Sequence, residues 1–539
     1  MKSYLYTPAA MASATFCPSV RGAPQSPWSA PPTGCVVVPN VCFEAEQIML
    51  HGPEAANALP RLMRLLNKTR DPSDVFSRLR PTIRPTVLVN PPRGEPYEYL
   101  PLATGAKRVP RHLRRRYTRR HTPSSTLDYS EETAVAFFTS WSNSFTEIFS
   151  RAVVRLYGLW CALVAIGERR EHLHLLPAMW GSDWGPDYAR YWLRPFSDLP
   201  VEQMAATPPR ELVKLIWRAQ ASVAQFARYA NQSAALFAAR RGPRCYRRGF
   251  VCDFTGMPWS HALQPWSAVQ MIAAHHGGAA QAANTQRVGV PRMRACSARG
   301  GGGSKGGGGG GGKGGGGGGG RDGVASDSQA VAPVDAAVIG RRLAGRGRGR
   351  EGSAAHSAGA GGRRGGGCVL NVVIADRKGR RKLRNLAELV DRCNEWRGPP
   401  PHTHLGINCT AHNFGVGLVD SLPTLWRADV FIVPHGADII NGFAMHAGAS
   451  VVEVMPVKQF QYGCPCDMYR RMYTYEGPTI LHYQMTTTNA SHAVSTEARK
   501  KGTYNSDLVV PWEALVPVLT HVVRVGGKRA NYKFRRFEY

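Results

Sequence analysis

The stretch from residue 428 to residue 456, ADVFIVPHGADIINGFAMHAGASVVEVMP, is the feature that most constrains the fold of this chain. It contains two short apolar runs, 429–433 and 450–454, that are typical of strands buried on both faces of a sheet. Between them, Asp438 can cap a helix that carries apolar residues at helical spacing. The stretch therefore predicts one strand–helix–strand unit of a parallel α/β sheet.

A short loop containing His435, Gly436 and Ala437 separates the first run from the predicted helix. In parallel sheets, ligands bind at the carboxyl ends of the strands, where a loop before a helix presents backbone N–H groups to an anion. A second loop of this kind lies between the apolar run 368–375 and a helix predicted over 383–396. Its basic side chains are Arg377, Lys378, Arg380 and Arg381. The two loops predict a diphosphate site, with ordinary surface charge as the alternative for the basic loop taken alone.

Composition divides the 539 residues into folded and unfolded parts. Many of the 58 glycines lie in one region, where runs such as GGGGGGG and GRGRGR cannot bury enough apolar area to offset chain entropy. The remaining length is too great for one core, so we expect two domains. The predicted segments are a disordered N-terminal segment 1–32, an N-terminal domain 33–280, a Gly/Arg-rich linker 281–367 and a C-terminal domain 368–539.

Strand-like runs and helical patterns both occur in the N-terminal domain. Residues 35–42 and 244–254 are predicted strands, and the proline-rich stretch 81–101 is predicted to be extended. Long helical patterns cover residues 131–165 and 210–240. The order of these elements, together with the C-terminal unit, predicts an α/β protein.

Two stretches of the N-terminal domain have both a functional and a structural interpretation. Residues 177–196 are rich in aromatic side chains, which either form a surface that stacks on sugar rings or belong to the core. Residues 107–121, KRVPRHLRRRYTRRH, either contact a polyanion or form a solvated basic loop.

The net charge of +31 and the pI near 10.1 suit a polyanionic partner, although basic loops alone can produce such values. Arg-Gly repeats in the linker resemble RNA-binding segments, and an RNA-binding protein is therefore an alternative function. Because no recognised RNA-binding motif accompanies the repeats, nucleic acid is at most an auxiliary partner.

The 12 cysteines show no zinc-type spacing, since Cys464 and Cys466 are too close for a ligand pair. Cys35 and Cys42 are seven residues apart, as are Cys245 and Cys252, so each pair is a candidate for a local disulfide. Neither a signal peptide nor an apolar stretch long enough to span a membrane is visible in the sequence.

The two loops together resemble glycosyltransferase family 61. The run RKGRRKLRN, residues 377–385, is similar to the RKGxRRxxN segment of that family. The run ADVFIVPHGADIIN, followed by VVEVMP, is similar to its HGA-containing signature, in the same order along the chain. The resemblance covers residues 369–456.

This resemblance implies a GT-B-like fold, in which two Rossmann-like domains face a cleft and the C-terminal one binds a nucleotide sugar. The donor is usually a UDP-sugar, the reaction inverts the anomeric carbon, and the acceptor is a glycan or glycoprotein. The family implies a hexosyl- or pentosyltransferase in the Golgi or endoplasmic reticulum lumen, with membrane association. No cofactor and no metal are expected, since the C-terminal half contains no Asp-x-Asp pair.

The resemblance also assigns roles to single residues. The expected donor-binding residues are Arg377 and Arg381 for the diphosphate, His435, Gly436 and Ala437 for the pocket, and Glu453 for a ribose hydroxyl. Asn385 would brace the basic loop and Asn441 the following helix. The alternatives are that Glu453 pairs with a neighbouring Arg and that His435 is structural.

The catalytic base is not identified by these motifs. The family typically has an N-x-x-H-x-x-x-D pattern in its first domain, and the nearest segment here begins at Asn143, with Thr146 in place of His. The catalytic candidates are therefore Glu147 and His435. A catalytically inactive scaffold that binds nucleotide is a further alternative.

Overall fold

The computed structural model describes part of the chain, and every structural statement below concerns those residues. They are 17, 34–44, 47–66, 86–90, 98–100, 128–139, 149–179, 191–202, 244–254, 264–277, 369–400, 402–403, 405–416, 418–457, 468–474, 479–494 and 505–539. All of them belong to one compact unit, formed by residues 1–298 and 367–539. The predicted linker and the basic run 107–121 lie outside the described residues.

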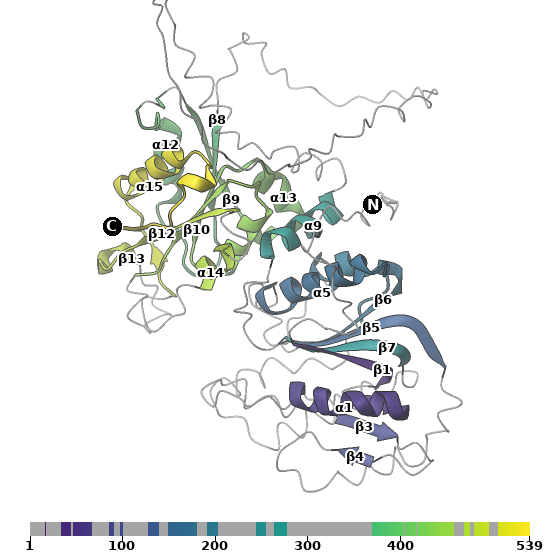
Figure 1. The fold of residues 1–539 in the computed structure, drawn as a ribbon. Helices are drawn as coiled ribbons and strands as arrows, with labels where there is room; N and C mark the ends of the chain where they lie inside the picture. Colours follow the sequence, from purple (N-terminus) through teal and green to yellow (C-terminus); the bar gives the residue numbers. More distant parts are fainter. Residues whose placement is uncertain are drawn as a thin grey trace, which may run out of the picture. The chain divides into compact units, whose positions relative to one another are not determined.

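The C-terminal half contains a six-stranded sheet in the order β15-β12-β11-β10-β8-β9 (Figure 1). Its strands are β8 (Val369–Ala375), β9 (Gly406–His412), β10 (Val430–Pro434), β11 (Ser450–Val454), β12 (Leu481–Thr486) and β15 (Arg536–Glu538). Every neighbouring pair is parallel. The α/β prediction is therefore confirmed for this half.

The strand order contains one topological switch point, between β8 and β10. From β8 the chain moves outward to β9, then returns to the other side of β8 and continues through β10, β11 and β12. The connections that leave β8 and β10 consequently run to opposite sides, and parallel sheets bind ligands at the carboxyl edge between two such strands. The two loops singled out in the sequence follow these two strands.

Alternate residues of the buried strands face two different cores. On β10, Val430 and Ile432 join a cluster under α12 (Leu386–Glu395) and α15 (Trp512–Val525). Phe431 and Val433 belong to another cluster on the opposite face. All residues of β10 and β11 are buried, as predicted for the runs 429–433 and 450–454. The predicted strand 368–375 and helix 383–396 are likewise found, as β8 and α12.

The helix predicted after His435 is wrong in type. Residues Ala437–Ala444 form a 3-10 helix, η8, whose cap position is Gly436 and which has no side-chain cap, so Asp438 is not its N-cap. The Ile439 carbonyl, which an α-helix would pair with the N–H four residues later, accepts a hydrogen bond from the Tyr473 hydroxyl at 2.6 Å.

The N-terminal half contains a seven-stranded mixed sheet in the order β4-β3-β2-β1-β7-β5-β6 (Figure 1). Its strands are β1 (Cys35–Glu44), β2 (Gln47–His51), β3 (Thr86–Asn90), β4 (Glu98–Leu100), β5 (Tyr129–Thr139), β6 (Leu173–Met179) and β7 (Arg244–Asp253). Strands β7, β5 and β6 are mutually parallel, whereas β1 pairs with β2 and β7 in antiparallel fashion. This sheet is thus only partly Rossmann-like.

One secondary-structure prediction in this half is wrong. Residues 131–139 carry a helical pattern but form most of β5, and the described helical residues of the stretch lie in η4 (Phe149–Val153) and α5 (Val154–Ala165). Core clusters cover both faces of β5, so its residues 134–137 are all buried and the apolar run loses the alternation that marks a strand. The pattern 210–240 lies outside the described residues.

The other predicted strands of this half are found. Residues 35–42 lie in β1, residues 244–253 form β7, and the extended stretch 81–101 includes β3 and β4. Of the aromatic-rich stretch 177–196, Trp192 and Phe196 are buried in the core, which favours the core interpretation for these two side chains. Residues 180–190 are outside the described part.

Helix α9 (Pro265–Gly277) ties the two predicted domains together. The Gln270 amide donates hydrogen bonds to the carbonyls of Phe443 and Met445, both at 3.0 Å, and Trp266 donates to the Met445 carbonyl at 3.1 Å. Helix α9 belongs to the predicted N-terminal domain 33–280, yet it caps the end of η8 in the C-terminal half. In the described part of the chain, no helix has both the length and the apolar character needed to cross a bilayer.

The predicted local disulfides are wrong in pairing. Cys35 is bonded to Cys252, and Cys42 to Cys245. Seven residues of a strand extend about 23 Å, so two cysteines at that spacing cannot reach each other within β1. The antiparallel register of β1 and β7 instead places each cysteine opposite its partner. Two more disulfides, Cys17–Cys161 and Cys393–Cys409, occur among the described cysteines.

We expect peptide mapping under non-reducing conditions to recover peptides linked through Cys35–Cys252 and Cys42–Cys245. Because both bonds close long loops of the unfolded chain, the paired substitution Cys42→Ser with Cys245→Ser should lower the free energy of unfolding by about 2–4 kcal/mol. Denaturant titration measures this loss. A peptide linked through Cys35 and Cys42 would contradict the register described above.

Candidate functional site

The loops after β8 and β10 meet at the carboxyl edge of the C-terminal sheet. Arg377, two residues beyond the end of β8, donates from Nη1 to the main-chain carbonyl of His435 at 3.1 Å. Its Nε lies 2.9 Å from Oδ2 of Asp438 in η8. The His435 N–H donates to the Val454 carbonyl at 2.8 Å, which fixes the second loop to the end of β11. The structure thus brings Arg377, His435 and their loops together at the switch point.

Gly436 is required by the conformation of this loop. Its φ of 146° is favoured only by glycine, and a Cβ at this position would lie 2.5 Å from Nη1 of Arg377. The guanidinium group therefore lies directly against the Gly436 backbone. Arg377 occupies the space that a Cβ of residue 436 would fill. The sequence analysis instead assigned Gly436 to the donor pocket.

Glu453 is the centre of a buried hydrogen-bond network. It is fully buried on β11, and its Oε1 accepts a hydrogen bond from His435 Nδ1 at 2.5 Å. Its Oε2 accepts from His482 Nε2 at 3.0 Å and from Gln484 Nε2 at 2.9 Å. The carboxylate is therefore buried and bonded within the protein through both oxygens, and its binding to a ribose hydroxyl stays a prediction. Its partners are two histidines and a glutamine, not the arginine considered as an alternative.

The charge state of Glu453 determines which His435 nitrogen carries a proton. Burial alone raises the pKa of Glu453, but the hydrogen bonds from His435 and His482 outweigh burial and lower this pKa to about 2. The ionised carboxylate only accepts hydrogen bonds, so His435 is protonated at Nδ1. In a neutral His435 ring, Nε2 is then a hydrogen-bond and proton acceptor. The ring also packs edge-on against Tyr469, with centroids 5.2 Å apart.

His482 and Gln484 were missed by the sequence analysis. Both lie on β12, LHYQMT, in which every residue is buried. Polar residues at alternate positions of an otherwise apolar strand are the available signal, because such residues share one face of the sheet and need partners there. Their partner is on the neighbouring strand β11, in register with β12. His435, His482 and Gln484 thus share the Glu453 carboxylate, His435 through Oε1 and the two β12 side chains through Oε2.

The other predicted residues of the basic loop occupy separate positions. Arg381 has a left-handed backbone, with φ of 58°, and is half-buried. Asn385 bonds both backbone groups of Val510, at 2.8 and 3.2 Å, and so braces the start of α12. The two remaining cations are exposed, Lys378 lying 2.5 Å from Asp376 and Arg380 donating to Asn505.

The remaining predicted residues are in η8 or outside the described part. Ala437 begins η8 and is half-buried, and Asn441 is buried within it. Glu147, together with the segment that starts at Asn143, lies outside the described residues. Within the described ranges, no group of three or more His, Cys, Asp or Glu side chains is arranged to hold a metal ion.

His412 is a further side chain at this edge. It ends β9, the strand beside β8, and its Nε2 lies 3.1 Å from the Ser421 hydroxyl. Burial lowers the pKa of His412, which favours the neutral ring. The sequence analysis did not predict β9, so nothing indicated that His412 would reach the same edge as Arg377 and His435.

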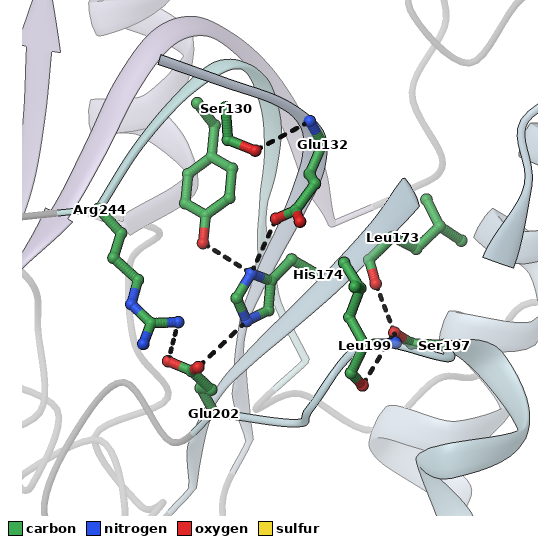
Figure 2. Close-up of polar contacts among 9 residues, drawn as sticks. Ser130, Glu132, Leu173, His174, Ser197, Leu199, Glu202 and Arg244 are labelled. Atoms are coloured by element: carbon green, nitrogen blue, oxygen red, sulfur yellow. Dashed lines mark hydrogen bonds and ion pairs between the residues drawn. The ribbon is translucent and has the colours of Figure 1, made fainter. Parts of the chain in front are cut away.

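A second polar cluster lies at the amino ends of β5, β6 and β7 (Figure 2). His174 lies between two carboxylates, with Nδ1 3.3 Å from Glu132 and Nε2 3.7 Å from Glu202. The Tyr246 hydroxyl is 2.8 Å from the same Nδ1, and Arg244 forms an ion pair with Glu202. Ligands of parallel sheets bind at the opposite edge, so this cluster serves to join the three strands.

Comparison with known proteins does not identify the chain. No protein-family model matches it, and no curated protein matches it significantly.

The His174 cluster predicts a pH dependence of stability. Burial outweighs the nearby carboxylates and lowers the pKa of His174, so the unfolded chain binds this proton at a higher pH than the folded chain. The free energy of unfolding should therefore fall as the pH drops below 6.5, the ordinary pKa of histidine. The loss from this group is at most about 1.4 kcal/mol per pH unit. Denaturant titrations between pH 7.5 and 5 should show a smaller loss of unfolding free energy for His174→Gln than for the natural protein.

His172→Gln is the matched control, because the His172 side chain is exposed on the neighbouring turn. This variant should keep the pH dependence of the natural protein. Equal slopes for the natural protein and for His174→Gln would contradict the assignment of the effect to His174.

Proposed function

We propose that the chain is an inverting glycosyltransferase that moves a sugar from a UDP-sugar to a glycan or glycoprotein acceptor. The observation that supports this most is the meeting of two loops, each similar to a segment of glycosyltransferase family 61, at the switch point of a parallel sheet. Parallel sheets bind nucleotides at that position. In the proposal, the C-terminal sheet binds the donor and the N-terminal half completes a GT-B-like cleft.

The chemistry available at this edge suits a diphosphate. Arg377 supplies a guanidinium charge beside the glycine-containing loop. Its side chain is 14% exposed. A guanidinium group binds phosphate oxygens through several N–H groups at once. As the bond from the anomeric carbon to the diphosphate breaks, negative charge grows on the leaving oxygen, and a fixed cation stabilises it. No metal or cofactor is required by this proposal.

The acceptor hydroxyl must lose a proton as its oxygen bonds to the anomeric carbon. His435 can take that proton at Nε2, because Glu453 holds its Nδ1–H and stabilises the imidazolium that results. Glu147 is the other candidate for the base. A chain that binds UDP but transfers no sugar would instead be an inactive scaffold of the same fold.

A lumenal location in the Golgi or endoplasmic reticulum is part of the proposal. Four disulfides among the described residues support it, since such bonds form and persist in oxidising compartments. The two that join β1 and β7 cross the centre of the N-terminal sheet, so oxidation would accompany folding of this half.

The proposal predicts that the full-length chain binds UDP more tightly than uridine, as measured by isothermal titration calorimetry. Arg377→Met should weaken UDP binding by about 1.5–3 kcal/mol, or roughly ten- to hundredfold, because a charge-assisted contact is lost. Uridine binding should change little. Arg377→Lys should give an intermediate loss, since it keeps the charge and loses the planar group.

Arg427→Met is the matched control, because Arg427 is exposed and precedes β10, at the opposite edge of the sheet. Its UDP affinity should equal that of the natural protein. Thermal melting without ligand establishes that each variant is folded. Equal affinities for UDP and uridine in the natural protein would remove the basis of the proposal.

A further inference from the structure

Asp438 places a carboxylate on the cation of the candidate phosphate site. Its Oδ2 lies 2.9 Å from Arg377 Nε, whereas Nη1 of the same guanidinium is bonded to the His435 carbonyl. Asp438 does not cap η8. The carboxylate therefore neutralises the Arg377 charge at the position where an anionic ligand would bind.

The Asp438 carboxylate is open to solvent and to a ligand. Its side chain is 29% exposed, compared with 14% for Arg377 and 0% for Glu453. A phosphate bound to Arg377 would approach this carboxylate closely and would be repelled by it. At a partly solvated site the repulsion between two charges remains appreciable, and it increases with the charge of the ligand.

A UDP-sugar and UDP, the product that remains after sugar transfer, differ in the charge of their diphosphate groups. The terminal phosphate of UDP has a second ionisation near pH 6, so at pH 7 or above UDP carries about one negative charge more than the esterified diphosphate of a UDP-sugar. Repulsion by Asp438 consequently acts more strongly on the product than on the donor. The interaction requires no movement of the chain, only the fixed position of the carboxylate.

We propose that Asp438 is a specificity-determining residue that weakens binding of the free nucleoside diphosphate relative to its phosphate ester. This inference rests on the proposed donor site at Arg377 and extends it to release of the product. A glycosyltransferase that bound UDP most tightly would be inhibited by its own product, and the Asp438 carboxylate counteracts this.

The test compares UDP with its β-methyl phosphoester, which carries the charge of the donor without a sugar. Calorimetry at pH 7.5 on the full-length chain gives both dissociation constants for the natural protein and for Asp438→Asn. Loss of the carboxylate charge should tighten UDP binding about fivefold to tenfold and ester binding about twofold to threefold. The affinity ratio of UDP to ester should therefore rise in the variant.

Asp391→Asn is the matched control, because Asp391 is an exposed acid on α12 and the change removes the same charge. It should leave both constants unchanged. An unchanged ratio in Asp438→Asn, with both ligands bound, overturns the inference and leaves the donor site standing. Weaker UDP binding in Asp438→Asn also overturns it. Failure of UDP to bind any form of the folded chain overturns the donor site and the inference together.

Discussion

The buried charge of Glu453 is the constraint on which the C-terminal site depends. A carboxylate with no solvent exposure is stable only when protein groups replace its lost hydration, and here His435, His482 and Gln484 do so. These donors come from the loop after β10 and from β12. The Glu453 carboxylate on β11 therefore links three neighbouring strands, β10, β11 and β12. The position of His435, and with it the loop that contacts Arg377, follows from this requirement.

The strands and the meeting of the two loops could be predicted from the sequence, because they depend on local patterns. Apolar runs such as 429–433 and 450–454 indicate strands buried on both faces, and parallel pairing brings their ends to one edge. The basic loop after β8 follows from the same logic. Local pattern therefore placed Arg377 and His435 at the site, and the structure supplied the contact between them.

The roles of single side chains depended on partners far away in the sequence and could not be predicted. Asp438 is bonded to Arg377 and does not cap η8, and the Ile439 carbonyl of η8 accepts a hydrogen bond from Tyr473. Two of the three partners of Glu453, His482 and Gln484, lie on a strand that no motif identified. In the N-terminal half, the register between β1 and β7 decides the disulfide pairing, and the central position of β5 hides its strand pattern.

In the proposed function, a nucleoside diphosphate binds at the carboxyl edge of the sheet, between β8 and β10. A crystal structure of the full-length chain with bound UDP tests it most directly. We expect the diphosphate within hydrogen-bonding distance of the Arg377 guanidinium and of backbone N–H groups in the loop at Gly436. Ordered UDP elsewhere on the chain, with this edge of the sheet empty, would contradict the claim.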